Sequence, residues 1–250
     1  MQNRSIAALI FICALFPAPG ALAQATPVDG AELVRLMHDQ DVGRWYRTLT
    51  FTQATLRRTA ADTMAHETWY EAMKLPGRLR IDVGAHDGNP VILFARDSIY
   101  VLRGAQLMPP RAGRNILLVL GFDIYGQPVS RSVSQLRDEG FDLTRIHADT
   151  WQGRRVFVVG AVRGDTTSKQ FWVDADRMVF VRMLAPPGPG AAGTEEVRFD
   201  DYQPAGGGWV ATLVTATSAG RLQQREQYSS IRVDTPVDDG RLDPASLARR

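Results

Sequence analysis

The sequence predicts an α+β protein built mostly from one antiparallel β-sheet of about ten or eleven strands. Residues 68–103 form a run of short strand-like segments separated by turn residues. In one of them Leu79, Ile81 and Val83 alternate with charged residues, which gives the segment one apolar face and one charged face. The connections between later strands are too short for parallel crossovers. The helices should cover the concave side of a large curved sheet.

The N-terminal part of the mature chain predicts one helix followed by two long strands. Asp29 is a suitable cap for a helix in which Leu33, Val34 and Met37 recur at helical spacing. Residues 45–59 and 64–75, the first rich in threonine and aromatic residues, read as strands.

A helical insertion is expected after Pro109-Pro110. Residues 114–126 are apolar in every direction, so this segment is either a core helix buried on all sides or a cover over a cavity. Pro128 precedes a second helix that should end at Gly140.

The remainder of the chain returns to strands. The candidates are residues 141–147, 154–162, 169–174, 178–184, 195–203, 207–218 and 222–234. Residues 242–247 predict a C-terminal turn or short helix.

Residues 1–23 have the composition of a secretory signal peptide. Arg4 supplies a positive charge, an apolar run ends near Phe16, and residues 21–23 form an A-x-A cleavage site. The single cysteine, Cys13, would leave with this segment. We therefore expect an exported, periplasmic protein cleaved near Ala23, with residues 24–250 forming a single domain.

The sequence lacks the patterns of common catalytic and cofactor sites. It has no G-x-S-x-G, no dinucleotide or phosphate-binding glycine motif, and its four histidines do not have metal-ligand spacing. The net charge of +2 does not favour a nucleic-acid partner. The expectation is a protein with no cofactor, no metal, no catalytic residues and no enzymatic activity.

Several segments together resemble the LolA/LolB-like superfamily of periplasmic lipoprotein localisation factors. They are residues 73–82 (MKLPGRLRID), residues 98–104 (SIYVLRG) and the F-x-Q element at Phe51-Thr52-Gln53. In the second half, residues 169–183, 195–203 and 237–247 are similar to outer-membrane lipoprotein-sorting proteins of the same superfamily.

The resemblance implies an incomplete, half-open β-barrel whose concave apolar face is covered by helices and receives lipid acyl chains. It implies a monomeric carrier that moves a lipoprotein or other lipid toward the outer membrane, between inner-membrane donor and outer-membrane acceptor proteins. Two alternatives remain open: a periplasmic module that senses lipids or lipoproteins and acts through a protein partner, and a secreted enzyme with a dispersed active site. The carriers have an arginine directly before the meander proline that locks the lid, whereas this chain has Leu75 there.

The candidate lipid-binding residues are the apolar positions of the meander and the insertion. They are Trp69, Met73, Leu79, Ile81, Val83, Ile116, Leu117, Leu120 and Phe122. For each of them an ordinary place in the core is the competing interpretation. If Leu120 belongs to a lid, Leu120→Asp should abolish ligand uptake; if it belongs to the core, the substitution should unfold the protein.

Overall fold

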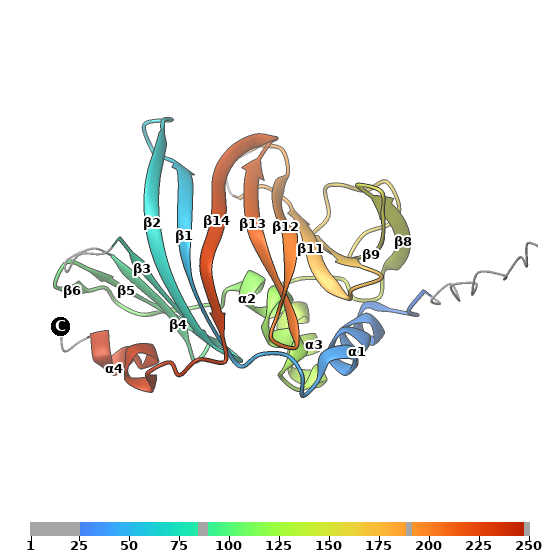
Figure 1. The fold of residues 1–250 in the computed structure, drawn as a ribbon. Coiled ribbons are helices and arrows are strands. Elements are labelled where there is room, and N and C mark those ends of the chain that lie inside the picture. The colour runs from blue at the N-terminus through green and yellow to red at the C-terminus, as the bar shows by residue number, and fades with distance from the viewer. Residues whose placement is uncertain (1–25, 85–89, 189–191, 248–250) are drawn as a thin grey trace, which may run out of the picture.

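The computed structural model describes residues 26–84, 90–188 and 192–247. These residues form an antiparallel sheet of fourteen strands that curves into an open half-barrel (Figure 1). The predicted fold class is confirmed. The predicted signal peptide lies outside the described residues. Among the described residues, no helix is long and apolar enough to cross a membrane.

The strand order places the first and the last long strand, β1 and β14, side by side in the middle of the sheet. It runs β6-β5-β4-β3-β2-β1-β14-β13-β12-β11-β10-β9-β8, and β7 pairs with β5. The strands are β1 (Thr48–Arg58), β2 (Met64–Lys74), β3 (Arg78–Val83), β4 (Val91–Ala95), β5 (Ser98–Arg103), β6 (Gln106–Leu107), β7 (Arg111–Ala112), β8 (Ile146–Trp151), β9 (Arg154–Val159), β10 (Gln170–Asp174), β11 (Val179–Ala185), β12 (Glu195–Ala205), β13 (Gly208–Ser218) and β14 (Arg221–Val233).

The strand count exceeds the predicted ten or eleven, and one predicted strand is misplaced. Two of the additional strands, β6 and β7, are only two residues long. The segment predicted as a strand at 141–147 is a turn for most of its length, and β8 begins only at Ile146. Phe141 and Leu143 are buried there without strand pairing. Their alternation with polar residues is the pattern of a strand, which is why the prediction was wrong.

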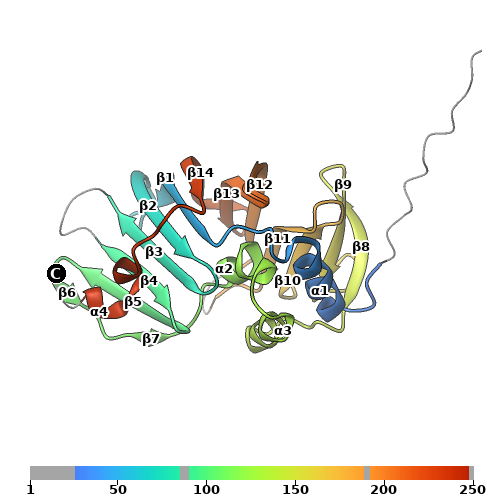
Figure 2. The ribbon, with the colours of Figure 1, turned by 60° about the horizontal axis from the view of Figure 1, so that its bottom comes forward.

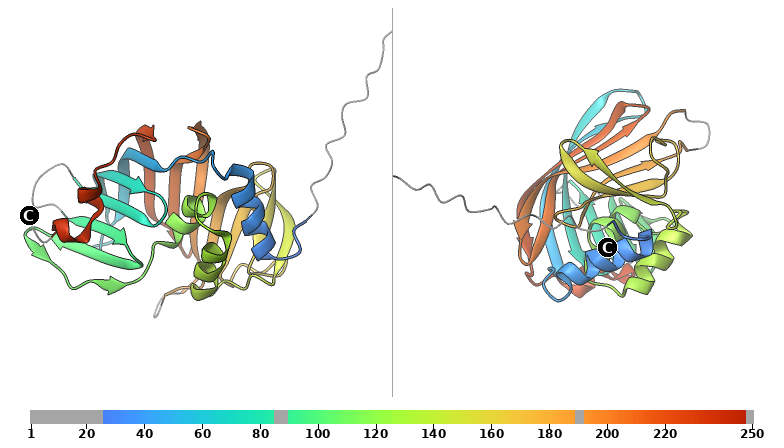
Figure 3. Two further views of the ribbon diagram at one scale, coloured as in Figure 1. Left: turned by 90° about the horizontal axis from the view of Figure 1, so that it is seen from below. Right: turned by 90° about the vertical axis from the view of Figure 1, so that its right-hand side faces the viewer.

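Three helices lie together against the concave side of the sheet (Figures 2 and 3). They are α1 (Gly30–Asp41), α2 (Ile116–Gly121) and α3 (Val129–Asp138), with the 3-10 turn η1 (Asp123–Tyr125) between the last two. Asp29 caps α1 as predicted, because its Oδ1 accepts a hydrogen bond from the Glu32 N–H at 2.8 Å. Three side chains of this helix, Leu33, Val34 and Met37, are fully buried.

The C-terminal segment crosses the outer face of the sheet. The 3-10 turn η2 (Asp239–Leu242) and α4 (Pro244–Leu247) lie over β3 to β5 (Figure 2). Leu242 and Leu247 pack there in a second apolar cluster with Leu93 and Leu102. This part of the sheet is therefore covered on both faces.

The charged face expected for β3 is consequently not open to water. Arg80 is 1% exposed, donates two hydrogen bonds to Asp82 and a third to the Arg241 carbonyl oxygen of η2. The local alternation was correct, but a remote segment covers the polar side.

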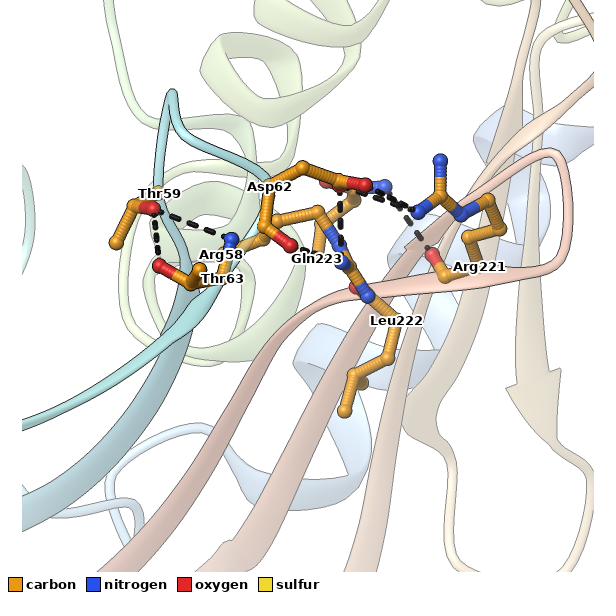
Figure 4. Close-up of polar contacts among 7 residues, drawn as sticks. All are labelled: Arg58, Thr59, Asp62, Thr63, Arg221, Leu222 and Gln223. Atoms are coloured by element: carbon orange, nitrogen blue, oxygen red, sulfur yellow. Dashed lines mark hydrogen bonds and ion pairs between the residues drawn. The ribbon is translucent and has the colours of Figure 1, made fainter.

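A carboxylate joins the tips of two hairpins at the far end of the sheet (Figure 4). Asp62, in the β1–β2 turn, accepts hydrogen bonds from Arg58 at 3.0 Å and from Arg221, at the start of β14, at 3.0 and 3.1 Å. Arg58 also donates to the Leu222 carbonyl oxygen at 2.9 Å. These contacts hold β1–β2 beside β13–β14 at the rim of the half-barrel.

Candidate functional site: a cavity under the helical insertion

A cavity of about 240 Å³ lies between the concave face of the sheet and the helical insertion. Its lining comes from six strands and from the segment that contains α2. The lining residues are Trp69, Glu71 and Met73 of β2; Leu79 and Ile81 of β3; Ile92 and Phe94 of β4; Asn115, Leu117, Leu118 and Phe122 of the insertion; Phe199 of β12; Val214 of β13; and Gln224, Glu226 and Tyr228 of β14. Most of these side chains are apolar, which suits a hydrophobic ligand.

Six of the nine candidate residues line this cavity. They are Trp69, Met73, Leu79, Ile81, Leu117 and Phe122. The strand residues among them point inward because inward positions recur at every second residue, and β3 pairs with β2 so that Leu79 is opposite Met73.

The other three candidates lie elsewhere. Val83, at the end of β3, and Ile116, at the start of α2, are half-buried against the main core and do not line the cavity. Leu120 is fully buried in that core. Leu120→Asp is therefore a test of folding and not of ligand uptake. Within α2 the two interpretations of the insertion both hold, since Leu117 faces the cavity and Leu120 the core.

The insertion is fixed over the sheet by local caps and by contacts to distant turns, among them the ion pair of Arg114 with Asp97 of the β4–β5 turn at 3.4 Å. Asn115 Oδ1 accepts the Leu117 and Leu118 N–H groups at 3.0 and 3.3 Å, which begins α2. Asp123 Oδ1, in η1, accepts the Gly77 N–H of the β2–β3 turn at 2.9 Å. This contact lies next to Leu75-Pro76, so a carboxylate of the insertion and a backbone N–H connect the insertion to the β2–β3 turn.

Burial changes the acidity of this contact. Asp123 is 1% exposed, and burial raises the pKa of its carboxyl to about 7, although the Gly77 N–H and the Arg131 charge act in the opposite direction. The carboxyl group therefore changes charge near neutral pH.

Phe122 separates this cavity from a second one. The second cavity, of about 400 Å³, lies between the α1–β1 loop and the β2–β3 turn and includes Leu75, Pro76 and Tyr125. Trp45 stacks on Tyr125 there, with ring centroids 3.8 Å apart. Phe122 lines both cavities, and its ring also meets Phe199 edge to face at a centroid distance of 6.3 Å.

One wall of the first cavity is polar, and this wall was not predicted. Glu71 of β2 and Gln224, Glu226 and Tyr228 of β14 all face the interior. The register explains the arrangement, because β1 lies between β2 and β14 and pairs Gln53 with both Trp69 and Tyr228. The wall is assembled from strands that are about 150 residues apart in the sequence.

The two glutamates of this wall differ in their partners. Glu226 accepts hydrogen bonds from the Tyr228 hydroxyl, at 2.7 Å, and from the Gln224 amide. Glu71 is 7% exposed and has no hydrogen-bond or ion-pair partner among the described residues. Burial, and to a lesser extent the Glu226 charge, raises the pKa of Glu71 well above its ordinary value. Burial also raises the pKa of Glu226, against the effect of its two donors.

Over residues 26–84, 90–188 and 192–247, no group of three or more histidine, cysteine, aspartate or glutamate side chains could hold a metal ion.

Comparisons with known proteins report on the fold. The sequence matches no family model and no curated protein. Three solved structures are similar over nearly their whole length. A DUF1329 family protein from Desulfovibrio piger has a TM-score of 0.57 at 14% identity, covering 89% of this chain and 100% of that one.

The other two carry more descriptive names. A putative outer membrane lipoprotein-sorting protein domain from Vibrio parahaemolyticus has a TM-score of 0.55 at 12% identity, covering 88% of this chain and 98% of that one. A LolA superfamily protein from Nitrosomonas europaea has a TM-score of 0.51 at 12% identity, covering 89% and 99%. With these matches and the open half-barrel covered by helices, this chain has the LolA-like fold of the lipoprotein-sorting proteins.

Proposed function

We propose that this protein is a periplasmic carrier that binds the acyl chain of a lipid or lipoprotein in the cavity under α2. The observation that supports the proposal is the cavity itself, whose wall of β3, β4 and α2 is apolar and lies where the fold has its concave face. The names of two similar proteins refer to lipoprotein sorting and to the LolA superfamily.

The size of the cavity fits one short chain or the end of a longer one. A methylene takes about the volume that a water molecule has in the liquid, roughly 30 Å³, so the cavity has room for on the order of eight methylenes. Each buried methylene contributes about 0.8 kcal/mol, which makes such a ligand bind without a charged contact.

The role includes export and transfer. The N-terminal sequence favours export to the periplasm, and a carrier of lipid would receive its cargo from an inner-membrane protein and deliver it to an outer-membrane one. The proposal needs binding and release alone, with no catalytic step.

The first test is to identify what the protein carries. Protein purified from membranes without detergent would be extracted with organic solvent, and the extract analysed by mass spectrometry. We expect a stoichiometric amphiphile that is missing from a cavity-filled variant, Leu117→Trp.

The control places the same side chain on the surface. Val162 is 56% exposed, so Val162→Trp should retain the amphiphile. Empty wild-type protein that also fails to bind added decanol in calorimetry would contradict the proposed function.

A further inference from the structure

The polar wall of the cavity has a carboxyl group that no group among the described residues satisfies. Glu71 is more than nine-tenths buried, lines the cavity and lacks a partner among the described residues. Between the two lining strands, Gln53 of β1 donates from its amide nitrogen to Thr55 at 2.8 Å, and its buried Oε1 has no donor among the described residues. Unpaired acceptors at buried positions cost free energy unless a ligand supplies the donor.

The charge around the cavity has one sign. Glu71 and Glu226 line it, and no lysine, arginine or histidine is among its described lining residues. The basic residue nearest by register is Arg57, which is opposite Gln224 across the β1–β14 pairing. The Arg57 guanidinium forms an ion pair with Glu67 and so does not neutralise the cavity wall. A ligand that fills the cavity therefore meets an acidic wall without a basic counterpart.

The partners of the two glutamates distinguish their roles. Glu226 is held by Tyr228 and Gln224, which leaves it fixed and partly satisfied. The Glu71 carboxyl group can accept hydrogen bonds from a ligand in the cavity. A cationic amine suits this site best, since an ammonium offers three donors and a charge, whereas an alcohol offers one donor and a carboxylate none.

We propose that the cavity takes an amphiphile whose cationic amine is buried against Glu71, with Glu226 on the same wall, while its hydrocarbon chain lies along the apolar wall of β3, β4 and α2. This inference deepens the proposed carrier function and rests on it. It specifies the class of cargo as an amine-bearing lipid with no phosphate or carboxylate at the buried end, because an anionic group there would face two glutamates.

Three ligands with the same chain separate this inference from the carrier function. Decylamine, decanol and decanoic acid would be titrated into the full-length mature protein by calorimetry at neutral pH. We expect decylamine to bind about tenfold or more tightly than decanol, because a charge-assisted hydrogen bond exceeds a neutral one, and decanoic acid to bind most weakly.

Two isosteric variants assign the preference to residues. Glu71→Gln should remove the advantage of decylamine over decanol and leave decanol binding close to that of the wild type. Glu226→Gln should reduce the advantage to a smaller extent. Asp176→Asn, which removes one negative charge at a side chain that is 71% exposed, should leave all three affinities unchanged.

The outcomes distinguish the two levels of the proposal. If decanol and decanoic acid bind and decylamine binds no more tightly, the inference is wrong and the carrier function stands. If none of the three ligands binds, the carrier function itself is wrong. A preference for decylamine that survives both Glu71→Gln and Glu226→Gln would also overturn the assignment to this wall.

Discussion

The carboxylate of Asp123 accepts the N–H of Gly77 at 2.9 Å and so connects the helical insertion to the β2–β3 turn. A buried acid with a pKa of about 7 makes this contact depend on pH.

Asp123 should make the protein less stable as the pH rises toward neutral. The folded state holds the proton up to about pH 7, whereas the unfolded chain releases it near pH 3.8. Its contribution is complete below the unfolded pKa and declines until the pH passes the folded pKa. Between pH 5 and pH 8 we expect a loss of about 3 kcal/mol, since one pKa unit corresponds to about 1.4 kcal/mol.

Urea unfolding of the wild type and Asp123→Asn at these two pH values checks this prediction. Asparagine keeps the acceptor for Gly77 and does not ionise, so the variant should gain stability relative to the wild type on going from pH 5 to pH 8. An identical difference at both pH values would show that Asp123 does not titrate in this range.

Leu117 and Leu120 should separate cavity from core within one helix. Leu120→Ala removes a fully buried side chain and should destabilise the fold by about 2–5 kcal/mol. Leu117→Ala should cost less stability and should weaken decanol binding, because Leu117 lines the cavity. Denaturant unfolding and calorimetry on both variants measure the two effects. An equal loss of stability in Leu117→Ala and Leu120→Ala would show that both residues belong to the core.

Asp82 should be essential to the covered outer face of β3. Burial acts to raise the pKa of Asp82, but the hydrogen bonds and charges of Arg80 and Arg241 keep it below its ordinary value. Asp82→Ala leaves the Arg80 guanidinium buried and unpaired, which should cost about 3–5 kcal/mol in urea unfolding. Asp239, whose partners Lys74 and Arg78 are partly exposed, is the matched control, and Asp239→Ala should change stability little.

Gly121 should tolerate no side chain where α2 ends. A Cβ at this position would lie 2.9 Å from Phe199 Cε2, and the Phe199 ring is buried against Phe122 and Phe180. Gly121→Ala should therefore cost about 1–3 kcal/mol through overpacking. A Cβ added at Gly126 would have no neighbouring side chain or backbone atom within 4 Å, so Gly126→Ala should be close to neutral. Thermal unfolding of the pair measures the difference, and equal melting temperatures would contradict it.

The apolar half of the cavity was predictable because it follows from local periodicity. Leu79 and Ile81 alternate within one strand, and alternation alone assigns them to one face. The polar half was missed for two reasons: alternation places Glu71 on the face of Trp69 and Met73, but a charged side chain was not expected there, and Glu226 joins it only because β14 lies across β1 from β2. The burial of Arg80 was missed for the same reason, because the segment that covers it is about 160 residues further along the chain.

The pairing of β1 with β14 orders the assembly of the molecule in time. Leu49 of β1 is opposite Val233 of β14. The two halves of the sheet therefore cannot join until almost the whole chain has been made. During synthesis from the N-terminus, β1 keeps an unpaired edge, and such edges are sites of aggregation. Completion of the half-barrel therefore waits for the last strand, and pairing over so long a sequence separation slows folding.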